Sequence, residues 1–210
     1  MRTEENWKHA KVDTFWGELA PCDHVVQLYE TDEIFLDTLA GFVGEGIKAG
    51  DCVVVIATEN HIADLNRRMA YEGLQTEALI ASDQYIPLDA DKTLAAFMRN
   101  GWPDDEQFIN TVSQIIKRAQ SKNRNVRAFG EMVAILWAQG NSGATVRLEH
   151  LWNEFCEKQA FSLFCAYPKS GFTMEVDESL MNICCAHAKI ISGSIKHATE
   201  VFYQRTVQTF

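Results

Sequence analysis

The stretch that decides the fold is VRAFGEMVAILW, residues 126–137. It begins with Val126–Phe129, whose apolar residues are typical of a buried strand. The pattern breaks at Gly130 and Glu131 and then continues as an apolar run that ends at Trp137. Open α/β sheets build their ligand crevices where strands end. We therefore expect Glu131 to stand at a crevice at the carboxyl end of a central strand.

Strand-like runs alternate with helical patterns on both sides of this stretch. The run CVVVIA, residues 52–57, is apolar throughout, which indicates a strand of a parallel sheet covered on both faces. Further strands are predicted at 24–29, 85–86 and 161–167, with a short candidate at 79–80. Helices are predicted to begin near Thr31, His61, Asp89 and Asp104, and a further helix follows a predicted turn at 139–143. The alternation predicts an α/β fold of three layers, with a mainly parallel central sheet and helices on both faces.

Three segments are expected along the chain. Residues 1–20 form a helical lead with several aromatic side chains, which we expect to pack on the domain or on a second copy, so that a homodimer is possible. Residues 21–190 form the main domain. One or two helices are expected from Asp177 onward, so that residues 191–210 form a helical extension at the carboxyl terminus.

Charge and composition exclude several classes of partner. The 210 residues carry a formal net charge of −10, and such a surface repels phosphate backbones and anionic lipids. We therefore expect neither direct nucleic-acid binding nor membrane binding. No apolar run approaches the ~20 residues that span a bilayer, and no secretory signal is recognisable. The six cysteines show no disulfide pattern, so we expect reduced thiols and a cytoplasmic location.

The first strand-to-helix turn argues against a phosphate site. A P-loop needs glycines whose backbone N–H groups cradle phosphate, together with a lysine. Residues 29–35 read YETDEIF, with three acidic residues and neither glycine nor lysine. The glycine-rich run at 44–50 precedes a strand, where helix capping and close packing explain it better. We therefore expect the P-loop to be absent and no nucleotide cofactor to bind.

The candidate site consists of residues near strand ends, where parallel strands converge. A few aromatic side chains with sparse polar groups make the usual composition of a small-molecule pocket. The predicted ligand-binding residues are Tyr29, Glu30, Phe35, Glu59, His61, Phe129, Glu131 and Tyr167. Buried Glu131 would need a polar partner, for which Arg127 and His24 are the candidates.

No catalytic residue is predicted. The chain has no nucleophile elbow, and no cysteine has a nearby histidine in an electropositive setting. An acid–base group of Glu30, Glu59 and Glu131 stays open as an alternative. Glu149 is expected to be a solvated helix residue or a partner of Arg147.

No metal site is expected either. The run Cys184-Cys185-Ala186-His187 has the ligand types that zinc prefers. If this run is helical, neighbouring residues point in different directions, so a site would need Cys165 or His24 as well.

The chain resembles the MEDS domain family, the methanogen/methylotroph, DcmR sensory domain. The matching segments span residues 22–190 and are HVVQLYE, IATENH, YIPLDADKTLAAFM, NGWPDDEQF, VRAFGEMVAILWAQGN, RLEHLWNEF and FSLFCAYP. The resemblance implies a RecA/KaiC-like core without a P-loop. It also implies sensing of small hydrocarbon-type ligands, with output through an attached DNA-binding or kinase module.

Such a module is not recognisable in this sequence, so output is expected in trans through a histidine kinase or a transcription factor. The leading hypothesis is a non-catalytic sensory domain. The alternatives are an interaction adaptor with a degenerate ATPase-like core and no ligand, and an enzyme that uses Glu131 as acid or base.

Overall fold

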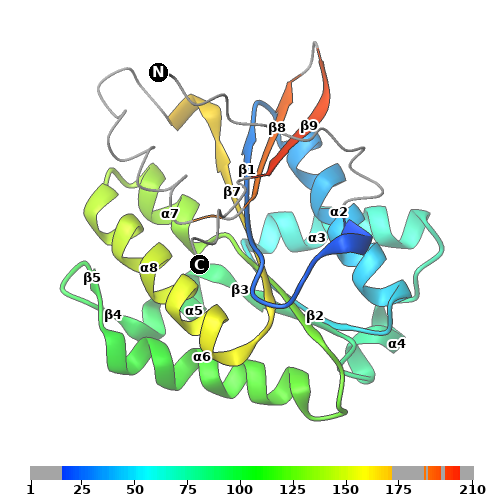
Figure 1. Ribbon diagram of the computed structural model, residues 1–210, viewed down its shortest axis with the longest axis horizontal. Helices are drawn as coiled ribbons and strands as arrows, with labels where there is room; N and C mark the ends of the chain where they lie inside the picture. Colours follow the sequence, from blue (N-terminus) through cyan, green and yellow to red (C-terminus); the bar gives the residue numbers. More distant parts are fainter. Residues whose placement is uncertain (1–15, 172–186, 188, 195–196, 204–210) are drawn as a thin grey trace, which may run out of the picture.

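The computed structural model describes residues 16–171, 187, 189–194 and 197–203. Their central feature is a seven-stranded sheet with the order β3-β2-β6-β7-β1-β8-β9 (Figure 1). The strands from β3 to β8 pair in parallel, and β9 pairs antiparallel with β8 at the edge. The bounds are β1 His24–Tyr29, β2 Cys52–Ala57, β3 Tyr85–Asp89, β6 Val126–Gly130, β7 Ser162–Pro168, β8 Lys189–Ser194 and β9 His197–Tyr203.

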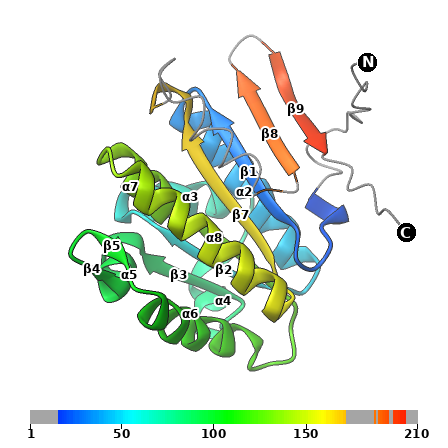
Figure 2. The same ribbon diagram turned by 60° about the vertical axis from the view of Figure 1, so that its left-hand side comes forward.

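Helices cover both faces of this sheet, as Figure 2 shows. The first face carries the short helix η1 Trp16–Glu18, α2 Asp32–Lys48, α3 Glu59–Tyr71 and α4 Thr76–Ala81. The second face carries α5 Ala90–Phe97, α6 Asp105–Gln120, α7 Met132–Ala138 and α8 Ser142–Gln159. A small ribbon, β4 Met98–Arg99 with β5 Trp102–Pro103, joins α5 to α6, and the short helix η2 Lys169–Gly171 follows β7. The three-layer, mainly parallel α/β fold is confirmed.

The strands β1, β2, β6 and β7 contribute alternate residues to two separate cores. In β1, Val25 and Tyr29 pack on the first face against α2, whereas Val26 packs on the second face. This division follows from the two-residue period of a strand, and it explains why the central strands are apolar throughout. It also means that every strand-end side chain belongs to one face or the other.

Two helices begin at the predicted positions, Thr31 and Asp104, whereas α3 begins after Thr58, two residues earlier than the predicted start at His61. Thr31, Thr58 and Asp104 are N-caps whose side-chain oxygens accept hydrogen bonds from backbone N–H groups of the first turn. Helix α2 ends as predicted near Gly50, whose φ of +84° is a conformation that glycine adopts at no steric cost. Within α2, a Cβ on Gly46 would lie 2.7 Å from Val53 Cγ2, so this glycine serves close helix–strand packing, as expected.

Two predictions of secondary structure are wrong. Residues 79–80 belong to α4, because the segment from Thr76 to Ala81 packs as one helical turn beside β3. The carboxyl-terminal extension from residue 191 is not helical where it is described, because β8 and β9 extend the sheet as a hairpin. Thr199, Val201 and Tyr203 give β9 the β-branched and aromatic composition of a strand, a signal that was available in the sequence.

The predicted ends of the chain are only partly described. Within the predicted lead, Trp16–Glu18 form a single 3-10 turn, and residues 1–15 lie outside the described residues. Residues 172–186 and 204–210, on which part of the predicted terminal helices falls, also lie outside them.

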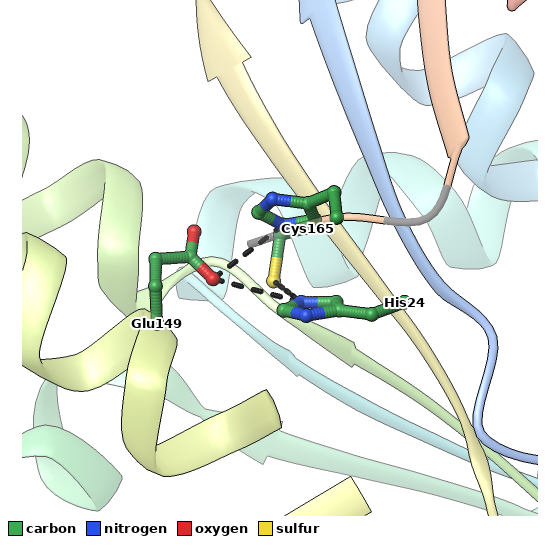
Figure 3. A group of neighbouring side chains, drawn as sticks. His24, Glu149 and Cys165 are labelled. Carbon is green, nitrogen blue, oxygen red and sulfur yellow. Dashed lines mark hydrogen bonds and ion pairs between the residues drawn. The ribbon is translucent and has the colours of Figure 1, made fainter. Parts of the chain in front are cut away.

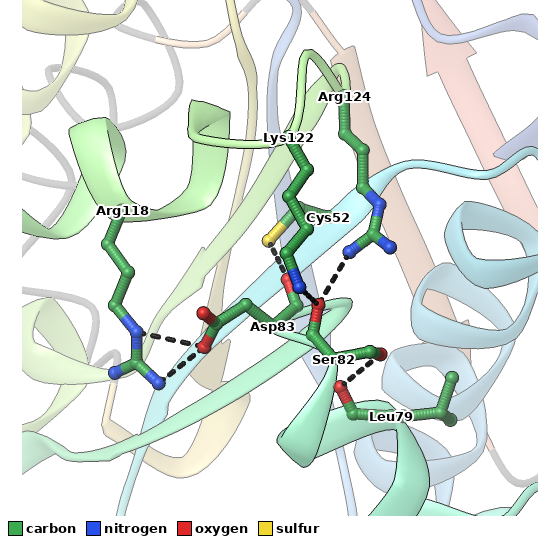
Figure 4. A network of polar contacts seen from close by, with 7 residues as sticks. All are labelled: Cys52, Leu79, Ser82, Asp83, Arg118, Lys122 and Arg124. Atoms are coloured by element: carbon green, nitrogen blue, oxygen red, sulfur yellow. Dashed lines mark hydrogen bonds and ion pairs between the residues drawn. The ribbon is translucent and has the colours of Figure 1, made fainter.

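Residues 117–127 hold a cluster of basic side chains, which make specific polar contacts. Arg118 pairs with Asp83, and Lys122 and Arg124 donate hydrogen bonds of 2.9 and 3.0 Å to the carbonyl of Ser82 (Figure 4). Ser82 is the C-cap of α4, so these cations stabilise the negative end of that helix.

Arg127, from the same basic cluster, is buried on the first face. It donates 2.6 Å and 2.7 Å hydrogen bonds to Asp51 Oδ2 and to the carbonyl of Trp16. It therefore joins the start of β6 to η1, far from Glu131, and is not the partner that the sequence suggested.

Candidate functional site

The site lies at the carboxyl ends of two neighbouring strands, β2 and β6. The chain leaves β2 through α3 on the first face, whereas it leaves β6 through α7 on the second face. Neighbouring strands whose connections diverge in this way define a topological switch point, where open α/β sheets bind ligands. The backbone N–H of Glu131 donates a 2.8 Å hydrogen bond to the carbonyl of Ile56, which continues the β2–β6 ladder up to this point.

Glu131 closes the switch point with both carboxylate oxygens. Oε2 accepts a 2.8 Å hydrogen bond from the backbone N–H of Thr58, at the start of α3. Oε1 lies 2.8 Å from His61 Nδ1, which donates to it because a carboxylate can only accept. The Glu131 side chain is 10% exposed and that of His61 is 18% exposed. The sequence correctly predicted that a buried Glu131 needs a partner, but the partner is His61, not Arg127 or His24.

Three aromatic rings surround this pair. Tyr29 stacks on Phe35 with a centroid distance of 5.0 Å. Phe35 meets His61 edge-on at 5.1 Å and Phe129 at 5.5 Å. The four rings and the carboxylate form what we call the strand-end cluster: Tyr29, Phe35, His61, Phe129 and Glu131. They come from β1, α2, α3, β6 and the end of β6, so the cluster joins elements that are distant in sequence.

The cluster is tightly packed. Phe35 and Phe129 are buried, and Tyr29 is almost buried, which makes His61 the member most open to solvent. A ligand that enters between these rings must therefore displace side chains. The packing puts a polar pair at the rim and apolar rings inside, which suits a small molecule with one polar group.

Electrostatics link the members of the cluster. The hydrogen bond to Glu131 raises the pKa of His61 above its usual value, and this outweighs the opposing effect of burial. Burial and the nearby carboxylates of Glu131 and Asp32 raise the pKa of Tyr29, so its hydroxyl stays protonated at neutral pH. The arrangement favours an imidazolium–carboxylate pair with a neutral phenol beside it.

Three predicted ligand-binding residues lie elsewhere. Glu30 lies beside Lys169 with its side chain 37% exposed, and Glu59 pairs with Lys92 with its side chain 77% exposed. Both acids are exposed to water and do not converge with Glu131, so the alternative of an acid–base group of three carboxylates is not formed. Tyr167 points to the second face, because side chains alternate along β7 and those of Phe164 and Ala166 lie on the first face.

Tyr167 belongs instead to a second buried polar group. Its hydroxyl donates a hydrogen bond to Glu149 of α8, which is 1% exposed. The expectation that Glu149 is solvated or pairs with Arg147 is therefore wrong, since Arg147 pairs with Asp105 on the surface. Complete burial raises the pKa of Glu149 to about 8, although the bond from Tyr167 works against this shift.

Comparison with known proteins identifies a family model that matches most of the chain. The family model "MEDS: MEthanogen/methylotroph, DcmR Sensory domain" matches residues 23–188. The chain belongs to the MEDS family. No curated protein sequence matches it. The family places this MEDS domain in a sensory or signalling role, and the resemblance seen in the sequence is confirmed.

Solved structures extend the comparison to the fold. A KaiC-like protein from Pyrococcus horikoshii is similar with a TM-score of 0.60 and 14% identity, over 97% of this chain and 91% of that one. A second protein from the same organism has a TM-score of 0.59 and 10% identity, over 95% and 94% of the two chains. At such identities the likeness shows the fold alone, and it confirms the KaiC-like core. No helix in the described part of the MEDS chain is long and apolar enough to cross a membrane.

Proposed function

We propose that this MEDS domain senses a small organic, hydrocarbon-type ligand at the strand-end cluster and signals without catalysis. The observation that carries the proposal is the Glu131–His61 pair, held at the topological switch point and backed by the rings of Tyr29, Phe35 and Phe129. The apolar body of such a ligand would displace these rings from one another and pack between them. The polar group would bond to His61 or Glu131.

Helix α3 offers a route for the signal. It begins beside the cluster, where Thr58 caps it and His61 lies in its first turn. It ends at Tyr71, which is 95% exposed. Two ion pairs, Arg68 with Asp37 and Arg67 with Asp64, line the open hollow beside Tyr71. A ligand that moves His61 would shift α3, and we propose that a histidine kinase or transcription factor reads this surface in trans.

The test is a thermal-shift screen of the full chain with short alcohols, ketones and haloalkanes. Compounds that raise the melting temperature are then tested on Phe35→Ala and Glu131→Gln, with Glu59→Gln as the matched control. Glu59 also follows a strand end, but its side chain is 77% exposed. Sensing at the cluster predicts that binding is lost in the first two variants and kept in Glu59→Gln. Hydrogen exchange in α3 should change with the same compound.

A second candidate function is favoured by the packing itself. Because the rings fill the space at the switch point, the domain could act as an interaction adaptor that binds no small molecule. In that case no compound in the screen stabilises the protein. A Phe35→Ala variant, which opens space, would then gain binding of small apolar compounds that the wild type lacks.

A further inference from the structure

Four buried side chains on the second face of the sheet direct metal-binding atoms toward one point. The four residues are His24 at the start of β1, Cys165 in the middle of β7, Glu149 in the middle of α8 and His187 two positions before β8. We call them the buried tetrad. Their Nε2, Sγ and carboxylate atoms all lie within 4.8 Å of one another. Figure 3 shows Cys165 Sγ between His24 and the carboxylate of Glu149.

Three of the six distances between the ligand atoms match those of a tetrahedral metal site. Glu149 Oε2 lies 3.5 Å from His24 Nε2 and 3.5 Å from His187 Nε2, and Cys165 Sγ lies 3.4 Å from His24 Nε2. Zinc binds nitrogen and oxygen at about 2.0–2.1 Å and sulfur at about 2.3 Å, which places the corners of a tetrahedron about 3.3–3.6 Å apart. The three distances lie within this range.

Hydrogen bonding explains the arrangement less well. A bond between imidazolium and carboxylate is normally ~2.7–2.9 Å long, so 3.5 Å is too long for either histidine. Oε2 of Glu149 accepts no hydrogen bond from the described part of the chain, although it is buried. A buried carboxylate oxygen in that state is costly unless a proton or a cation neutralises it.

The surroundings complete the pattern of a metal centre. Tyr167 donates its hydroxyl proton to Oε1 of Glu149, which leaves Oε2 directed at the two histidines. Such a hydrogen bond to the distal oxygen orients a ligating carboxylate. One thiolate and one carboxylate would also balance the two positive charges of a divalent ion, so the loaded site would carry no net charge.

We propose that the buried tetrad binds one divalent transition-metal ion, with zinc as the best fit to its mixed nitrogen, sulfur and oxygen donors. Binding releases to solvent the Cys165 proton and the proton that Glu149 holds in the metal-free site, and both histidines bind as neutral imidazoles. The four protein ligands leave no open position, which makes the site structural. The ion would fasten His187, two residues before β8, onto α8 and the β1–β7 pair.

No zinc site was expected at residues 184–187, because neighbouring residues of a helix would direct their ligand atoms in different directions. Cys184 and Cys185 lie outside the described residues, whereas His187 is described and is not helical. The ring centroids of His187 and His24 lie 3.9 Å apart, and Cys165 belongs to the same group, so the fold supplies both of the residues of which the sequence analysis required one.

The first experiment measures metal in the full chain. Protein from zinc-supplemented cells, purified without chelators, is expected to contain one equivalent of zinc by elemental analysis. X-ray absorption of this protein should report two imidazoles, one sulfur and one further oxygen around zinc. Refolding with Co²⁺ should produce the visible absorption of a tetrahedral site and a sulfur-to-cobalt charge-transfer band. A folded wild-type chain that holds no metal in either preparation, or a zinc shell with more than one sulfur, would overturn the proposal.

The second experiment assigns the ligands. Cys165→Ser should remove the charge-transfer band, while Cys52→Ser, a matched buried thiol on β2, should keep it. Tyr167→Phe should weaken cobalt binding by about 10–100-fold while keeping the band, because it removes only the support of Glu149. A band that survives Cys165→Ser, or equal loss in Cys52→Ser, contradicts this ligand set. None of these results depends on organic ligand binding at the strand-end cluster.

Discussion

Replacing Glu131 with glutamine tests how the strand-end cluster is held together. The substitution keeps the size of the side chain and one acceptor for the Thr58 N–H, but it removes the charge that faces His61. A hydrogen bond between charged groups contributes about 1.5–3 kcal/mol, and this pair is largely buried. We therefore expect Glu131→Gln to lower the free energy of unfolding by about 1.5–3 kcal/mol at pH 6. For a domain of this size the melting temperature should fall by roughly 3–12 °C.

The same variant should change the pH dependence of stability. The folded-state pKa of His61 is raised above its unfolded value by Glu131. The stabilisation is therefore fully present below the unfolded pKa of about 6.5 and is lost as pH rises through the higher folded value. The difference between wild type and Glu131→Gln should consequently be largest near pH 6 and should shrink toward pH 9.

The assay is urea unfolding of both proteins across this pH range, with Glu59→Gln as the control. Glu59 forms an exposed pair with Lys92, so its loss should cost no more than about 1 kcal/mol and should depend little on pH between 6 and 9. Glu131→Gln as stable as Glu59→Gln at pH 6, or a deficit that is constant with pH, would refute the coupling to His61.

Two further predictions concern the packing beneath the site. Gly46→Ala should destabilise the protein by roughly 0.5–2 kcal/mol, since the added Cβ would lie 2.7 Å from the side chain of Val53 in β2. In the same helix, Gly44→Ala should stabilise the protein by about 0.5–1 kcal/mol, because the nearest atom to its added Cβ, Oε2 of Glu72, is 3.7 Å away. Thermal unfolding compares the two variants, and equal melting temperatures would contradict the prediction. Arg127→Met should cost about 3–5 kcal/mol in urea unfolding because it leaves Asp51 buried without its cation, while Arg118→Met, which breaks an exposed pair, should cost no more than about 1 kcal/mol. Similar losses in both arginine variants would show that burial of the Arg127 pair is unimportant.

Much of the fold could be predicted because its signals are local. The all-apolar run of β2 indicates burial on both faces, and the caps at Thr31 and Asp104 mark helix starts through chemistry within four residues. The hairpin of β8 and β9 was not predicted, because the helical pattern that begins at Asp177 was extended through it in spite of the β-branched and aromatic residues of β9. The short helix α4 was missed because two adjacent apolar residues fit either period.

The candidate site shows where local signals stop. Glu131 was singled out correctly, since a carboxylate inside an apolar run must be compensated wherever it lies. Its partner was not, because His61 is 70 residues away and reaches Glu131 only through the adjacency of β2 and β6. Tyr167 was assigned to the wrong side of the sheet, because a strand end predicts convergence but the two-residue period decides the face.

The sequence by itself determined the layered α/β class, the family, the acidic turn in place of a phosphate loop and the buried carboxylate after the central strand. These depend on composition, spacing and interactions between near neighbours in the chain. Only the tertiary structure decided that Glu131 meets His61 and that Glu149 meets Tyr167, His24 and His187. Strand order and register bring such residues together across long separations, and the sequence carries no local energetic signal for the pairing.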